Sequence, residues 1–126
     1  MTNMTQKYGR LSDKLVNLTV SKLLEWEYDQ PTDACRTKVG DKIIEVKMGR
    51  NDIEEPIAIV SVFNASGNLA ERFTDETLSD LKTNTRGYDS YWKLLEYLHE
   101  TAKNQATGVG KDLDDLLEQL DEIFPF

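Results

Sequence analysis

The sequence predicts a single α+β domain, and three observations lead to that class. Apolar residues recur at helical spacing from Leu11 to Trp26 and again after Asp89. Between these parts, four short segments alternate apolar and polar residues, as half-buried strands do. Short clusters of Gly, Pro and Asn separate the segments and predict turns. The expected order is one helix, a four-stranded antiparallel meander, and two to three helices packed on the sheet.

Chain length and composition fit one domain over residues 1–126. Hydrophobic residues make up 39% of the chain and charged residues 30%, which is typical of a folded domain and not of a disordered one. A chain of this length can bury a core without disulfides. Residues 1–10 are polar, and we expect them to form a flexible lead-in.

The first predicted helix runs from Leu11 to Trp26. Ser12 is a suitable N-cap, and Leu11 before it can pack against Val16. The apolar arc of this helix is wider than one sheet contact requires, so we expect it to touch the sheet and also another helix or a second subunit. Pro31 follows and breaks the helix.

A hairpin is expected next, with Gly40 and Asp41 as its two-residue turn. That turn sets a register in which Arg36 lies opposite Glu45 and can pair with it. The apolar face of the hairpin then consists of Cys35, Thr37, Val39, Ile44, Val46 and Met48.

The third and fourth predicted strands cover residues 57–63 and 69–73. The third is apolar on both faces, with Ile57, Ile59 and Phe63 on one side and Ala58, Val60 and Val62 on the other. A strand of this kind is usually buried on both sides. Either helices cover both faces of the sheet, or one face stays open to a partner.

The C-terminal part predicts a helical turn and two helices. The turn begins at Thr74 or Asp75, with Leu78 and Leu81 directed inward. The apolar stripe of the next helix contains Tyr88, Tyr91, Leu94, Leu95, Leu98 and Ala102. The last helix, Lys111 to Phe124, has a leucine-rich face and an acidic face.

The stretch from Gly108 to Asp112, GVGKD, contains the Gly-Lys pair that phosphate-binding loops carry. Such a loop needs a Gly five residues before the Gly of its Gly-Lys pair, and a Ser or Thr after the Lys. Gln105 and Asp112 occupy those positions here. The glycines therefore predict a helix C-cap and a turn between two helices.

The charge of the chain is unevenly distributed. Residues 1–50 carry nine Lys or Arg against seven Asp or Glu, and residues 51–126 carry six against sixteen, so the net charges are +2 and −10. Binding to nucleic acid requires a basic surface, and we expect no nucleic-acid partner. A protein partner with a basic or neutral surface fits this charge better.

The expected compartment is the cytoplasm. The single cysteine, Cys35, cannot form an internal disulfide, which favours reducing conditions. The first residues lack the apolar core of a signal peptide, and no segment has the length and hydropathy of a membrane span.

The sequence predicts no catalytic residue, no metal ligand set and no cofactor. His99, in LHETA, lacks the second His of the zinc-protease motif because Lys103 stands in its place. We expect His99 at the boundary of the core and Cys35 within it. Enzymatic activity is therefore not the expected function.

The leading hypothesis is a non-enzymatic protein-binding module, such as an adaptor, an inhibitor or a chaperone-like protein. It would bind a protein partner or a second copy of itself through apolar surface that exceeds the needs of one core. The residues predicted to form this interface are Leu24, Val60, Val62, Phe124 and Phe126.

The alternative hypothesis is that the protein binds or converts a small anionic ligand beside aromatic residues such as Tyr91 or Trp92. It depends on basic side chains that the hairpin register places on one face, with one more nearby. The residues predicted for this site are Arg36, Lys38, Lys47 and Arg72.

Overall fold

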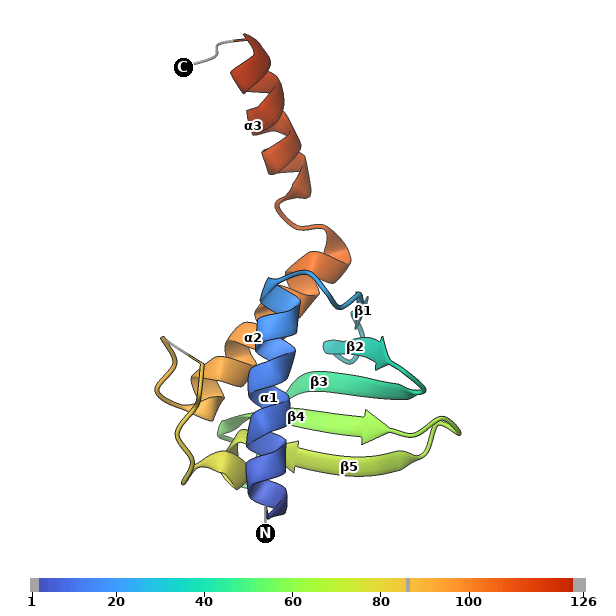
Figure 1. Ribbon diagram of the computed structural model, residues 1–126, viewed down its shortest axis with the longest axis vertical. Helices are drawn as coiled ribbons and strands as arrows, with labels where there is room; N and C mark the ends of the chain where they lie inside the picture. Colours follow the sequence, from blue (N-terminus) through green and yellow to red (C-terminus); the bar gives the residue numbers. More distant parts are fainter. Residues whose placement is uncertain (1–2, 86, 124–126) are drawn as a thin grey trace.

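Helices α1 and α2 cover one face of a five-stranded antiparallel sheet in a computed structural model that describes residues 3–85 and 87–123 (Figure 1). The elements are α1 (Met4–Val20), β1 (Trp26–Asp29), β2 (Ala34–Val39), β3 (Lys42–Arg50), β4 (Pro56–Phe63), β5 (Leu69–Thr74), the 3-10 helix η1 (Asp75–Leu78), α2 (Tyr91–Thr107) and α3 (Lys111–Ile123). The strands lie side by side in chain order. The α+β class and the meander are confirmed, with five strands where four were predicted.

The additional strand, β1, lies where the sequence predicted the end of the first helix and a loop. Helix α1 ends at Val20, and Lys22 adopts a positive φ of 59°, which turns the chain out of the helix. Trp26 is held at the start of the strand because its indole Nε1 donates to Thr19 Oγ1 at 3.1 Å. Trp26 therefore belongs to the strand although its spacing continues that of the helix, and the predicted helix end was wrong.

Helix α1 also begins earlier than predicted. Asn3 is the N-cap, and its side chain accepts a backbone N–H one turn later at 2.8 Å. Ser12, the predicted N-cap, lies within the helix and donates to the Tyr8 carbonyl at 2.9 Å. Tyr8 stacks on Phe73 of β5 with ring centroids 4.4 Å apart. Residues 4–10, expected to be a flexible lead-in, therefore form the first turns of α1.

The hairpin of β2 and β3 has the predicted register. Arg36 lies opposite Glu45, and Cys35 lies opposite Val46. Gly40 adopts a φ of 63° at the turn, a conformation that glycine reaches without steric cost. Local turn chemistry and the cross-strand pair were sufficient to fix this part of the sheet.

The core lies between the sheet and the helix layer. One cross-strand row runs through all five strands beneath the helices, and it consists of Tyr28, Cys35, Val46, Val60 and Phe73. Both helices contribute to the same core, through residues that include Leu15 and Val16 of α1 and Leu94 and Leu98 of α2. In the part of the chain that the structure describes, the opposite sheet face has no helix on it.

Helices α1 and α2 run in the same direction and are joined by two hydrogen bonds. At the first residue of α2, Tyr91 Oη donates to Oδ2 of Asp13, which lies midway along α1, at 2.7 Å. Near their last residues, Gln105 Nε2 donates to the Thr19 carbonyl at 2.8 Å. Gly108 ends α2 in the left-handed conformation, with a φ of 71°, which confirms the predicted C-cap.

Helix α3 extends away from the sheet and from the other helices (Figure 1). None of its residues is buried. The prediction that the last helix packs on the sheet was therefore wrong. Across the described ranges, no helix combines the length and the apolar character needed to cross a membrane.

Two leucine substitutions test whether the core contributes more to stability than α3 does. Leu98 is 0% exposed and Leu120 is 46% exposed. Leu98→Ala should lower the free energy of unfolding by about 2–5 kcal/mol, because it removes buried methyl groups and leaves a cavity. Leu120→Ala should change it by less than about 0.5 kcal/mol. Urea unfolding monitored by circular dichroism measures both values, and equal losses would contradict the separation.

Candidate functional site

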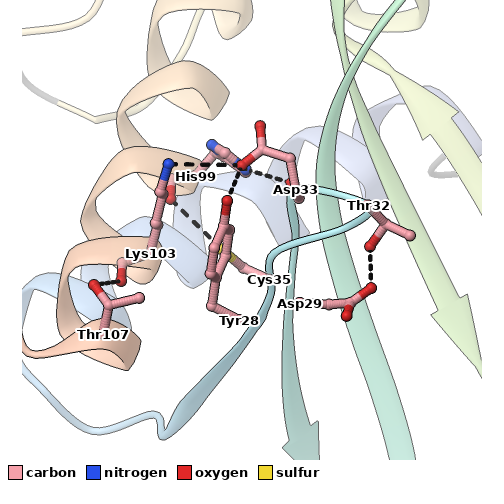
Figure 2. A network of polar contacts seen from close by, with 8 residues as sticks. All are labelled: Tyr28, Asp29, Thr32, Asp33, Cys35, His99, Lys103 and Thr107. Carbon is pink, nitrogen blue, oxygen red and sulfur yellow. Dashed lines mark hydrogen bonds and ion pairs between the residues drawn. The ribbon is translucent and has the colours of Figure 1, made fainter.

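A polar cluster joins the β1–β2 loop to α2 (Figure 2). At its centre is Asp33, whose Oδ1 accepts a hydrogen bond from Tyr28 Oη at 2.6 Å and lies 3.8 Å from Lys103 Nζ. His99 Nε2 lies 2.8 Å from the Asp33 carbonyl oxygen and 3.6 Å from Oδ1. Cys35 Sγ donates to the His99 carbonyl at 3.7 Å. A Tyr, an Asp, a His, a Lys and a Cys thus meet at one place.

Helical spacing explains how α2 supplies its two members. His99 and Lys103 are four residues apart, so they lie one above the other on the same side of the helix. Lys103, which replaces the second His of a zinc motif, pairs with Asp33 instead, and its Nζ lies 5.0 Å from the ring centroid of Tyr28. Asp33 itself adopts a φ of 53°, which Asp tolerates better than most residues.

Three members of this cluster, Tyr28, Cys35 and Lys103, have pKa values raised above their ordinary values. Burial, assisted by Asp33, raises the pKa of the Cys35 thiol to about 12. The hydrogen bond to Asp33 raises the pKa of Tyr28, and the Tyr28 hydroxyl raises the pKa of Lys103. A general acid or base works best with a pKa near the ambient pH. Their raised pKa values make Cys35, Tyr28 and Lys103 poorly suited to that role at neutral pH. The contacts of Asp33 with His99 and Lys103 form a clamp that holds the β1–β2 loop on α2.

Two sequence expectations concern this cluster. Cys35 is 0% exposed, which confirms it as a core residue. His99, expected at the core boundary, is 7% exposed and is held by the Asp33 carbonyl. Within residues 3–85 and 87–123, no three His, Cys, Asp or Glu side chains are grouped in a way that could hold a metal ion.

The four basic residues of the alternative hypothesis all lie on the open face of the sheet. Arg36 Nε is 2.7 Å from Glu45 Oε2, and Glu45 is 7% exposed. Arg72 Nε donates to Ser61 Oγ at 3.0 Å. The cross-strand register places these side chains in one row, with Glu45 next to Ser61. Two of the four predicted cations are therefore already engaged within the sheet.

The remaining two cations do not complete a shared pocket. Lys38 lines a groove of about 760 Å³ together with Arg36, but neither Lys47 nor Arg72 lines it. The walls of this groove are formed by Leu23, Leu24, Glu25, Trp26, Glu27, Arg36, Thr37, Lys38 and Ile43. The aromatic residues named beside the basic face, Tyr91 and Trp92, belong to α2 on the other side of the sheet. Sequence alone did not reveal this separation.

The predicted interface residues also differ in accessibility. Val60 is fully buried beneath the helices, and Val62 and Leu24 are partly buried against the same core. Phe124 and Phe126 lie outside the described residues. On β4, the residues that face away from the helices include Ile59 and Phe63, both partly exposed. The apolar strand has two similar faces, and its sequence does not tell which of them meets the helices.

Helix α3 carries an uncovered apolar stripe of five residues. The exposed fractions are 59% for Leu113, 49% for Leu116, 51% for Leu117, 46% for Leu120 and 67% for Ile123. The acidic residues of the helix, all exposed, are Asp112, Asp114, Asp115, Glu118, Asp121 and Glu122. Gly108 and Gly110, with φ angles of 71° and 87°, set the turn from which α3 leaves the domain. Both faces of an amphipathic helix are thus in contact with solvent.

No known protein family, curated protein or solved structure matches this chain at a significant level.

The state of Cys35 leads to a prediction about thiol reactivity. With a pKa of about 12, the thiolate fraction at pH 8 is on the order of 10⁻⁴. Native protein should therefore react with iodoacetamide far more slowly than protein unfolded in guanidinium, where a free cysteine has a pKa of about 8.5. Mass spectrometry of the alkylated chain measures both rates. Equal rates would contradict the burial of Cys35.

The clamp at Asp33 leads to a prediction about stability. Asp33→Ala should lower the free energy of unfolding by about 1–2 kcal/mol, because Ala is strained at the positive φ of this position. Loss of the Tyr28 acceptor acts in the same direction. Asp33→Asn should cost less, because Asn keeps an oxygen acceptor and tolerates this backbone conformation. Urea unfolding compares the two variants. An Asn variant as unstable as the Ala variant would show that the carboxylate charge dominates.

Proposed function

We propose that the protein is a non-enzymatic protein-binding module whose contact element is α3. The observation that carries this proposal is the uncovered stripe from Leu113 to Ile123, in which every apolar side chain is at least 46% exposed. Burying a Leu or Ile side chain completely stabilises a complex by about 1.5–3 kcal/mol. A partner that covers this stripe therefore gains a large apolar contribution.

The spacing of the stripe matches a helix that docks into a groove. Leu113, Leu116, Leu120 and Ile123 follow one another at intervals of three, four and three residues, and Leu117 widens the same face. Helices recognised in apolar grooves use anchors at this spacing. The acidic residues occupy the rest of the helix surface, so a groove in a basic surface suits α3 better than one in an acidic surface.

Helix length supports the same function. Isolated helices shorter than about 12–15 residues are marginally stable in water, and α3 has 13 residues with none buried. Contact with a partner would supply the packing that the rest of the chain does not. Adaptors, inhibitors and chaperone-like proteins all operate by this kind of contact. The single cysteine, which has no disulfide partner in the chain, supports a reducing compartment such as the cytoplasm.

The test uses substitutions confined to the stripe. Leu116→Asp combined with Leu120→Asp should abolish stoichiometric co-purification of the partner chain and leave the melting temperature of the domain within about 2 °C of wild type. Glu122→Gln, an exposed residue on the face of α3 away from the stripe, is the matched control and should retain the partner. Affinity capture followed by quantitative mass spectrometry, with light scattering to detect self-association, measures the outcome. A set of bound chains that is unchanged in the double variant would refute the proposal.

A further inference from the structure

Helix α1 presents a basic stripe to solvent on the side opposite the core. Lys7, Arg10 and Lys14 are exposed and follow at intervals of three and four residues, so they lie on one side of the helix. The only acidic residue of α1 is Asp13. Asp13 is 6% exposed and accepts hydrogen bonds from Tyr91 and from Thr85, so it does not offset the cations at the surface.

The same side of α1 carries apolar residues. Met4 is 45% exposed, Leu18 is 38% exposed, and Leu11 between them is partly buried. These three residues are spaced by seven, which places them on one line along the helix, next to the basic stripe. The outer face of α1 therefore combines an apolar line with three positive charges that form no ion pair among residues 3–85 and 87–123.

Helix α3 has the opposite charge and a matching length. Its 13 residues contain six carboxylates and one lysine, a net charge of −5. At 1.5 Å per residue it is about 20 Å long, and the 17 residues of α1 span about 25 Å. Packed helices lie about 8–10 Å apart, close to the screening length of about 10 Å at 0.1 M salt. Charges on the two faces would therefore attract when the apolar lines meet.

Charge also argues against the simplest alternative pairing. Two α3 helices packed on each other would bring two net charges of −5 together, and two heptads make a short coiled coil. Helix α3 points away from its own α1, and the C-terminal ends of α1 and α2 lie side by side (Figure 1). The acidic helix is thus placed to reach another molecule.

We infer that α3 docks on the outer face of α1 in a second copy of this chain. This inference rests on the proposed function of α3 as a contact helix. The exchange is reciprocal: each copy gives its α3 and receives that of the other, which makes a two-fold symmetric dimer with two identical contacts. Two contacts double the buried area toward the roughly 1,600 Å² of a standard stable interface.

A charge-swap experiment tests the pairing. The first variant carries Lys7→Glu, Arg10→Glu and Lys14→Glu, so that α1 and α3 are both acidic. The second carries Asp114→Lys, Glu118→Lys and Asp121→Lys, so that both are basic. Each variant alone should dimerise at least about 10-fold more weakly than wild type, and an equimolar mixture should recover dimers to within about 3-fold. Sedimentation velocity at 50 mM salt, over a range of concentrations, measures the dissociation constants.

Several results would overturn the inference. They are a wild-type chain that stays monomeric, single variants that dimerise as tightly as wild type, and a mixture that gains nothing over its components. All six substituted residues are exposed, and unchanged circular dichroism of each variant establishes that it is folded. A wild-type monomer with α3 folded back on its own α1 also counts against the second copy.

The double variant Leu116→Asp with Leu120→Asp distinguishes failure of the proposed dimer from failure of the proposed function of α3. If that variant loses a different protein as its partner and the charge swap has no effect, α3 is a contact helix but does not dock on a second copy. No effect of the stripe variant on any association would remove the proposed function itself.

Discussion

The fold depends on one choice, namely which face of an alternating sheet meets the helices. The row from Tyr28 through Val46 to Phe73 is buried under α1 and α2, and every other arrangement follows from that burial. Because side chains alternate along a strand, the same choice sends Arg36 and Glu45 to the outer face, where they pair at 2.7 Å. A shift of one residue in register would bury charges and expose the core.

The same burial of one sheet face explains why the core does not include α3. Helices α1 and α2 already complete the core, with Leu94, Leu95 and Leu98 fully buried. The leucines of α3 have no remaining apolar surface beneath the helix layer to cover. In the proposed function this helix contacts another molecule, and in the proposed dimer the basic stripe on α1 of a second copy receives it.

Sequence predicted the features that depend on neighbours in the chain. Gly40 fixed the hairpin register, and Gly108 fixed the end of α2, because each position requires a backbone conformation that glycine adopts easily. Strand β1 escaped prediction because Trp26 continues a helical spacing by chance and is held by Thr19 through a tertiary hydrogen bond. The Asp33 clamp escaped because its members are as far apart as residues 28 and 103. The position of α3 could not be predicted because the same amphipathic pattern fits packing within a chain or between chains.

The exposed position of α3 has a consequence for turnover in the cell. Proteases cleave segments that open locally, and a 13-residue helix that buries no residue opens at little cost in free energy. The glycine-containing joint from Gly108 to Gly110 is an accessible cleavage point when no other molecule shields it. Unassembled copies are thus expected to be trimmed and degraded first, so that the amount of intact protein follows the amount of complex.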